Sequence, residues 1–115
     1  MTADGFRKLA LRLPEASESA HMGHPDFRVR GTIFATLGHP DVGFGMVKLT
    51  PELQEALVNA EPSVYTPAKG AWGRGGATGV CLRPAKAKSV GLALQAAWRS
   101  VASTGRKAKK SRKPR

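Results

Sequence analysis

Residues 21–37 read HMGHPDFRVRGTIFATL, and the alternation of apolar and polar residues in this stretch gives the strongest indication of the fold class. Apolar Phe27 and Val29 alternate with polar neighbours, and residues 32–37 continue the alternation with β-branched and aromatic side chains. A period of two residues in such side chains predicts half-buried β-strands. The stretch is therefore expected to contain a strand, a break at its proline and a hairpin that turns near residues 30–32.

Arg28 and Arg30 occupy positions between these apolar residues. Successive side chains of a strand point to opposite faces of the sheet, so both guanidinium groups are expected on the face away from the apolar one. There they can contact the phosphates of a nucleic acid, or they can simply be solvated. The sequence leaves both interpretations open.

An amphipathic helix is predicted on the N-terminal side of this stretch. Thr2 or Asp4 can cap it, and Pro14 lies just beyond its end. The polar residues 15–20 are expected to link this helix to the first strand. The apolar positions of the helix follow a helical spacing on one face and are Phe6, Leu9, Ala10 and Leu13.

On the C-terminal side, turn-forming residues at 38–43 separate the hairpin from a third predicted strand at 44–49. A second helix is expected to begin at Pro51, because Thr50 can cap it, and to end before Pro62. The expected inner face of this helix consists of Leu53, Ala56, Leu57 and Ala60.

A glycine-rich segment follows a short strand predicted at residues 64–66. Residues 70–79 include five glycines, but they lack the Gly-Lys-Ser/Thr ending of a P-loop and do not follow a long buried strand. The segment is therefore expected to be a loop that presents Trp72 and Arg74. Trp72 can stack on a base while Arg74 contacts phosphate, or Trp72 can plug the edge of the core.

The last predicted elements are a strand at 78–82 and a helix at 86–102. The core face of that helix is expected to consist of Val90, Leu94, Ala97, Trp98 and Val101. Residues 104–115 are rich in Lys and Arg with almost no apolar side chain, which predicts a disordered tail. Residues 1–103 are thus expected to form one α+β domain, an antiparallel meander of about five strands packed against helices.

The chain carries 19 Lys and Arg against 8 Asp and Glu, a formal net charge of +11. Seven of the basic residues lie in the last dozen positions, and the rest of the chain is only mildly basic. Such a balance favours a polyanionic partner. No apolar run is long enough to span a membrane and no signal peptide is evident, so a cytoplasmic protein without a membrane role is expected.

Groups suited to catalysis or metal binding are few. Cys81 is the only cysteine and is expected to be a small buried side chain. The three histidines, His21, His24 and His39, have no cluster of cysteines or carboxylates beside them to complete a metal site. The sequence predicts no metal, no cofactor and no enzyme, although folding can assemble a catalytic site that spacing does not reveal.

Several short motifs occur in an order that resembles the MmcQ/YjbR-like family. They are Leu13-Pro14-Glu15, GHPDFRV at 23–29, IFATL at 33–37, VKL at 47–49 and Pro67-Ala68 before the glycine-rich segment. The likeness spans residues 5–102. Two places depart from the family pattern. Ala97-Trp98-Arg99 stands where a Ser-Tyr pair is usual, and Gly75-Gly76 stands where many members have a tryptophan beside the glycine.

The resemblance implies an α+β fold, and a double-wing mode of DNA binding in which hairpins contact the duplex. It supplies no catalytic residues. Together with the charge it predicts a DNA-binding module of low sequence specificity, monomeric or weakly dimeric. The alternative is a domain that binds a small molecule or a protein through the Trp72 segment and has no nucleic-acid role. The expected nucleic-acid-binding residues are Arg28, Arg30, Lys48, Lys69, Trp72, Arg74, Arg106, Lys107, Lys109, Lys110, Arg112 and Lys113.

Overall fold

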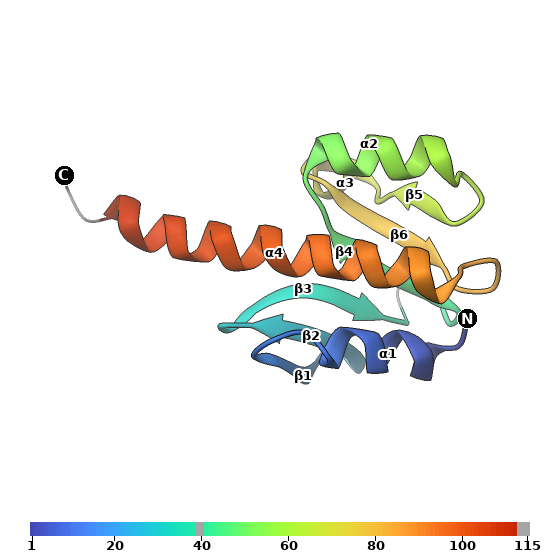
Figure 1. Ribbon diagram of the computed structural model, residues 1–115, viewed down its shortest axis with the longest axis horizontal. Helices are drawn as coiled ribbons and strands as arrows, with labels where there is room; N and C mark the ends of the chain where they lie inside the picture. The colour runs from blue at the N-terminus through green and yellow to red at the C-terminus, as the bar shows by residue number, and fades with distance from the viewer. Residues whose placement is uncertain (39–40, 113–115) are drawn as a thin grey trace.

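The computed structural model describes residues 1–38 and 41–112, apart from the side chains of His21 and of residues 104–112. Helices and strands of these residues form an α+β fold, which confirms the expected class (Figure 1). The helices are α1 (Ala3–Leu11), α2 (Pro51–Ala60), α3 (Gly70–Arg74) and α4 (Ala87–Arg112). The strands are β1 (Ala16–His21), β2 (His24–Val29), β3 (Thr32–Leu37), β4 (Phe44–Lys48), β5 (Tyr65–Pro67) and β6 (Ala77–Cys81).

These strands form one antiparallel sheet in the order β1-β2-β3-β4-β6-β5. Two-residue turns, Met22-Gly23 and Arg30-Gly31, join the first three strands. In each turn the backbone φ angles are 54° and 82°. Positive φ at both positions matches the right-handed twist of the paired strands in so short a turn. The hairpin expected to turn near residues 30–32 is thereby confirmed.

Residues 16–21 form strand β1, where the sequence predicted only a polar link. The strand pairs with β2 from Ala16 opposite Val29 to His21 opposite His24. It lies at the edge of the sheet, and Ala16 is its only partly buried side chain among those described. A strand that buries so little shows no apolar alternation, which is why the pattern did not reveal it. The sheet has six strands within the described residues instead of about five.

Pro25 lies inside β2, so the break expected at this proline is wrong. Pro25 stands opposite Ala20 of β1, while the pairing of β2 with β3 begins only at Asp26. At this position of β2 no residue of β3 is paired, so a backbone N–H group on that side would have no strand partner. The sheet therefore tolerates the proline without losing a ladder hydrogen bond.

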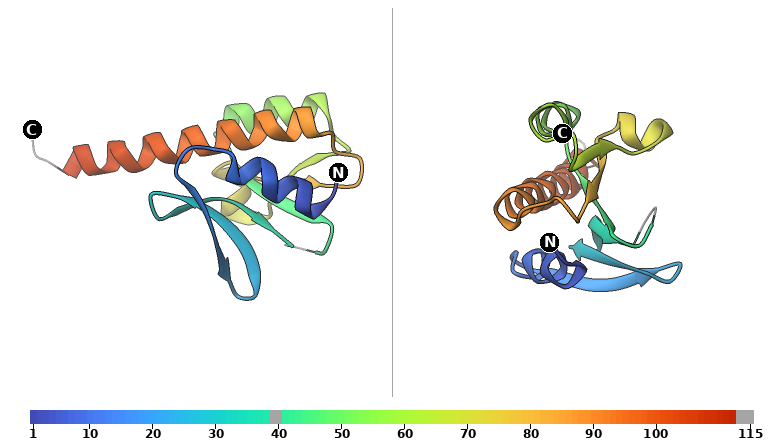
Figure 2. Two further views of the ribbon diagram at one scale, coloured as in Figure 1. Left: turned by 60° about the horizontal axis from the view of Figure 1, so that its bottom comes forward. Right: turned by 90° about the vertical axis from the view of Figure 1, so that its right-hand side faces the viewer.

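Helices α1 and α4 cover one face of the sheet, and the main core lies between them and the strands (Figure 2). Phe6 of α1 meets Phe27 of β2 with ring centroids 6.1 Å apart. Gly45 of β4 makes room for this contact, because a β-carbon there would lie 2.9 Å from the Phe6 ring. As predicted, α4 buries Val90, Leu94, Ala97 and Val101. Trp98 is only half-buried, and its indole Nε1 donates to the Pro14 carbonyl at 2.8 Å.

The inner face of α2 differs from the prediction. Gln54 is its buried residue, because Gln54 Nε2 donates to the carbonyl oxygens of Gly73 and Ala77, both at 2.9 Å. Polar groups that find such partners can be buried at little cost. Of the predicted inner residues Leu57 is partly buried, and those that are exposed instead are Leu53, Ala56 and Ala60.

The glycine-rich segment contains the short helix α3, where a loop was expected. Two of its glycines are required by close packing. A β-carbon at Gly73 would overlap the carbonyl oxygen of Ala68, and one at Gly76, where φ is +114°, would overlap that of Leu49. Only glycine fits these positions, so the packing explains both glycines without a phosphate ligand.

Helix α4 continues well past the predicted end at residue 102 and projects beyond the sheet (Figure 1). The side chains from residue 104 onward, and all of residues 113–115, lie outside the described residues. The disordered tail at 104–115 and the domain boundary at residue 103 therefore stay predictions. Within the part of the chain that the structure describes, no helix is both long and apolar enough to cross a membrane.

Candidate binding site on the open face of the sheet

Strand β2 divides its side chains between the two faces of the sheet. Phe27 and Val29 are buried in the core under α1 and α4. Asp26 and Arg28 lie on the opposite face, as the alternation along a strand requires. We call this second face the open face, because neither α1 nor α4 covers it.

The register of the strands extends the open face across the sheet. Asp26 stands opposite Thr36 of β3, and Thr36 stands opposite Met46 of β4. Residues paired across antiparallel strands share a face, so these three side chains form one row. Lys48 follows Met46 by two residues and therefore lies on the same face.

A cavity of about 500 Å³ lies over this row, with mostly apolar walls. Figure 2 shows that α3 lies on the side of the sheet opposite α1 and α4, which allows α3 to form one wall. The opposite wall is formed by the β1–β2 turn. The residues that line the cavity are Met22, His24, Pro25, Asp26, Ile33, Thr36, Met46, Lys48 and Trp72.

Trp72 reaches the cavity because α3 is anchored beneath it. The hydrogen bonds from Gln54 to Gly73 and Ala77 hold α3 between α2 and the start of β6. Trp72 is 55% exposed. It therefore lies outside the core cluster, so it does not plug the core, and stacking on a base stays a prediction.

Asp26 is fully buried beneath the cavity and pairs with Arg28. Arg28 Nε donates to Asp26 Oδ1 at 2.8 Å, and a second guanidinium nitrogen donates to Oδ2 at 3.1 Å. The hydrogen bond to Asp26 raises the pKa of Arg28 above its ordinary value. A guanidinium held in this two-bond geometry has fewer donors for a phosphate than the sequence suggested.

Two polar groups of the cavity wall have no partner in the described part of the chain. Lys48 is half-buried and forms no ion pair with any described carboxylate. Thr36 Oγ1 is buried and makes no hydrogen bond to a described residue. The buried Thr36 hydroxyl costs free energy because it has no described partner, and the Lys48 ammonium can pair with a negatively charged ligand.

The other basic residues predicted for a binding site lie elsewhere. Arg30 sits in the β2–β3 turn, where its Nε donates to Glu15 Oε1 at 3.2 Å. Lys69 and Arg74 are exposed at the two ends of α3 and pair with no described acid. Of the predicted residues whose side chains are described, Lys48 and Trp72 line the cavity, and Arg28 is joined to it through Asp26. Those that do not line it are Arg30, Lys69 and Arg74. The side chains outside the described residues are those of Arg106, Lys107, Lys109, Lys110, Arg112 and Lys113.

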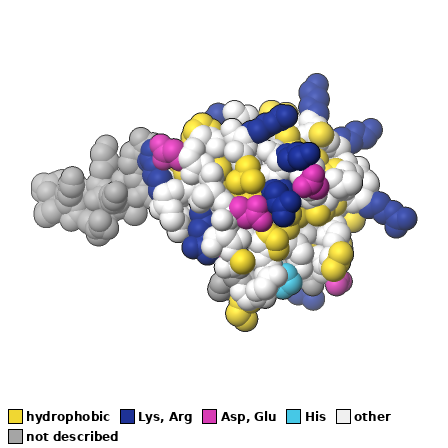
Figure 3. All heavy atoms as spheres, turned by 90° about the horizontal axis from the view of Figure 1, so that it is seen from below, with side chains coloured by type: hydrophobic (Ala, Val, Ile, Leu, Met, Phe, Trp, Pro, Cys, Tyr) yellow, Lys and Arg dark blue, Asp and Glu magenta, His cyan; other side chains and the backbone are white. Residues whose placement is uncertain are grey.

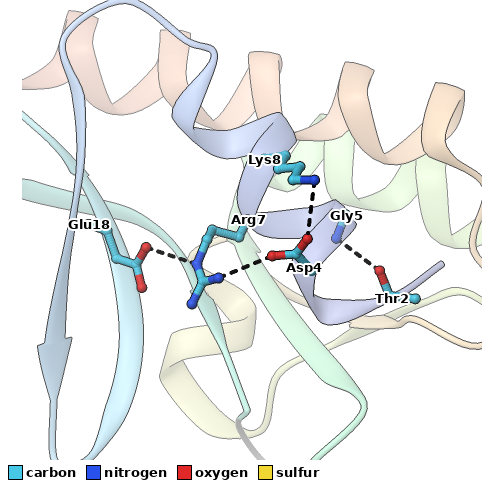
Figure 4. A network of polar contacts seen from close by, with 6 residues as sticks. All are labelled: Thr2, Asp4, Gly5, Arg7, Lys8 and Glu18. Carbon is cyan, nitrogen blue, oxygen red and sulfur yellow. Dashed lines mark hydrogen bonds and ion pairs between the residues drawn. The ribbon is translucent and has the colours of Figure 1, made fainter.

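The junction of α1 with β1 carries paired charges. Arg7 Nε donates to Glu18 Oε1 at 3.0 Å, and Arg7 also pairs with Asp4 at 3.1 Å (Figure 4). Lys8 lies 3.3 Å from the second oxygen of Asp4. In the view of Figure 3 the basic side chains spread around the outline, and acidic side chains stand beside those near the middle. The face seen there shows no concentrated cationic patch among the described residues.

Sequence reasoning missed most of the cavity lining, including Asp26, Thr36 and Met46. Part of the signal was present, because Asp26 precedes Arg28 by two residues in the same alternation. The strand register that joins it to β3 and β4 was not visible. Cys81 is partly exposed, where a buried side chain was expected. No group of three or more His, Cys, Asp or Glu within the described residues could hold a metal ion.

Comparison with known proteins finds a family model and a solved structure that resemble this chain. A family model described as YjbR matches residues 11–100. The crystal structure of Deinococcus radiodurans protein DR2400, described as a DUF419 domain, is similar with a TM-score of 0.75 and 22% sequence identity. The similarity covers 90% of this chain and 80% of that protein, and DUF419 is the same YjbR/MmcQ family. At this identity the likeness shows the fold. No curated protein matches the chain.

Proposed function

The chain belongs to the YjbR family, and from this premise we propose that it is a DNA-binding module that contacts the phosphate backbone with little sequence specificity. The observation that carries the proposal is the net charge of +11, with seven basic residues in the last dozen positions. Basic side chains that neutralise phosphates release condensed counterions, which drives such binding. The YjbR family is not a known enzyme family, which agrees with a binding role. The proposal includes a cytoplasmic location and a monomer or weak homodimer.

Lys69 and Arg74 are the strongest candidates in the folded body. Both are exposed at the ends of α3 without a described acidic partner. Arg28 is engaged by Asp26, so it contributes less. Arg30 lies at a hairpin tip, where a double-wing mode requires contacts. Its exposed pair with Glu15 is worth at most about 1 kcal/mol, so a phosphate can displace it.

The test is fluorescence anisotropy of a labelled DNA duplex with the full chain over a series of salt concentrations. We expect a linear fall of log K with log salt. The variant Lys69→Gln/Arg74→Gln should reduce the slope by roughly 0.9 for each phosphate that the α3 side chains no longer neutralise. The matched control is Arg7→Gln/Lys8→Gln, which removes the same charge where Asp4 and Glu18 already neutralise it.

The outcomes separate three cases. A smaller slope for the α3 variant than for the control supports contact by the folded body. The second case is an equal slope for both variants together with loss of binding when the seven basic tail residues are changed to Gln. This result would show that the tail binds DNA as a polycation and that the folded body makes no contact. Absence of binding at low salt would contradict the proposal.

A second candidate function is the binding of a small molecule or a protein without any nucleic-acid role. The cavity beside Trp72 favours it, because a concave, mostly apolar site with few polar groups is the usual form of a ligand site. It becomes the preferred function if the full chain binds no DNA at low salt.

A further inference from the structure

We propose that the cavity on the open face binds a small, flat organic anion: an apolar ring system that carries one carboxylate. The proposal concerns the cavity that Trp72 lines, whereas the DNA contacts proposed for the folded body are at Lys69 and Arg74, the two ends of α3. It holds or fails independently of them.

The size and walls of the cavity suit a flat apolar body. A volume of about 500 Å³ lies in the range of about 300–1,000 Å³ typical of small-molecule sites. Two of its large apolar side chains stay in water: Met22 is 82% exposed and Trp72 is 55% exposed. An indole offers a flat face for stacking, and a methionine adapts to the shape of a ligand. A ring placed between them removes both apolar surfaces from water.

The charges of the lining select an anion. The negative charge of Asp26 is balanced by Arg28, which takes both carboxylate oxygens. Lys48 has no described acidic partner, so its ammonium group carries the net charge of the lining. Lys48 is also half-buried, and its ammonium group can form a charge-assisted hydrogen bond to a carboxylate.

The same lining disfavours a nucleotide. A base edge needs several donors and acceptors, yet both oxygens of Asp26 are occupied and the walls are mostly apolar. A phosphate chain needs several donors, and Lys48 is the one Lys or Arg side chain among the described residues that line the cavity. A single carboxylate on an apolar ring matches one cation and mostly apolar walls.

The chain provides its own reporter for this site, because it has two tryptophans. Trp72 lines the cavity, whereas Trp98 bonds to Pro14 on the other side of the sheet. We would record the indole ¹H–¹⁵N resonances of the full chain during titration with 1-naphthoate. The Trp72 resonance should shift in a saturable way while Trp98 stays in place. A ligand of this size is expected to bind with a dissociation constant of about 1 mM or below.

Two comparisons test the role of charge. 1-Naphthamide has the same ring without the charge and should bind less tightly than 1-naphthoate. Lys48→Met keeps the apolar stem and removes the charge. It should weaken the binding of 1-naphthoate about five- to tenfold and leave the affinity for 1-naphthamide unchanged. Lys88→Met removes an exposed lysine from α4 and should change the affinity for neither ligand.

Three results would each overturn the proposal. The first is a Trp98 shift as large as that of Trp72, or no saturable shift of either. The second is equal binding of naphthoate and naphthamide. The third is the same affinity in Lys48→Met and Lys88→Met. An unchanged Trp98 resonance in the Lys48→Met variant verifies that this variant is folded. A loss of binding then reflects the missing charge and not unfolding.

Discussion

The covered face and the open face of the sheet are built from the same strands, one residue apart. On the covered face Phe27, Ala35 and Val47 form a row across β2, β3 and β4, and all are fully buried. The neighbouring row on the open face contains a carboxylate, a hydroxyl and a thioether. A step of one residue along each strand thus separates the core from the candidate site.

The two rows differ because of what packs on them. Side chains of α1 and α4 fill the covered row, so its surroundings are dry and continuous. The five-residue helix α3 reaches only part of the open row, and a cavity remains. Stability is therefore concentrated on the covered face, and the open face can carry polar groups without a described partner.

The largest expected effect breaks the covered row. Phe27→Ala should lower the free energy of unfolding by about 3–5 kcal/mol, because it leaves a cavity in the packed core. Met46→Ala should cost less, about 2–3 kcal/mol, since Met46 is buried but lies outside the core cluster and borders existing open space. Urea denaturation of both variants measures the difference. Equal losses would mean that the open face is as much a core as the covered one.

A smaller effect is expected on the open face itself. Arg28→Met should destabilise the protein, because fully buried Asp26 loses its cation. The double variant Asp26→Leu/Arg28→Met should recover part of the loss, since it leaves no unpaired charge. The exposed ion pair of Arg30 with Glu15 offers a control, because Arg30→Met should lower the free energy of unfolding by only about 0.2–1 kcal/mol. Urea denaturation measures all three, and no recovery in the double variant would show that the pair matters for packing rather than charge.

The smallest effect tests a polar group on the covered face. Tyr65 is buried, and its hydroxyl lies 2.7 Å from Ser89 Oγ, which donates to Glu61 at 2.7 Å. Burial, and secondarily the charge of Glu61, raises the pKa of Tyr65 above its ordinary value. The neutral form is thus favoured in the folded state, so this stabilisation is complete below about pH 10 and is lost as the pH rises above it.

Tyr65→Phe should therefore lower the free energy of unfolding by about 1 kcal/mol at neutral pH. The variant should also lose less stability at alkaline pH, because it has no phenol to ionise. The chain has one tyrosine, so the tyrosinate absorbance reports its ionisation directly. The measurement is that titration together with thermal unfolding between neutral and alkaline pH. An ordinary tyrosine pKa in the folded protein would contradict the assignment.

Features with a local signal were predictable from the sequence. The alternation around Phe27 located β2, the glycine at position 31 located the turn, and Thr50 before Pro51 located the start of α2. In each case one residue and its near neighbours decide the conformation. The predicted core stripe of α4 was also largely correct, because helical periodicity depends only on residues three and four apart.

Features that depend on distant partners were missed. Gln54 is buried because two carbonyl groups from the segment after β5 accept its amide hydrogens. Strand β1 exists because β2 pairs with it, although its own side chains are almost all exposed. Neither fact leaves a trace in the local pattern of apolar residues.

Three features followed from the sequence alone: the charge of the chain, the α+β class and the placement of Arg28 on the side of β2 away from Phe27. These follow from composition and from the period of two residues along a strand. Strand pairing in the folded chain places Asp26, Thr36 and Met46 in one row, and the docking of α3 places Trp72 across a cavity from Met22. Register and the docking of α3 join segments far apart in the chain, so contacts between those segments, and not local preference, place the site.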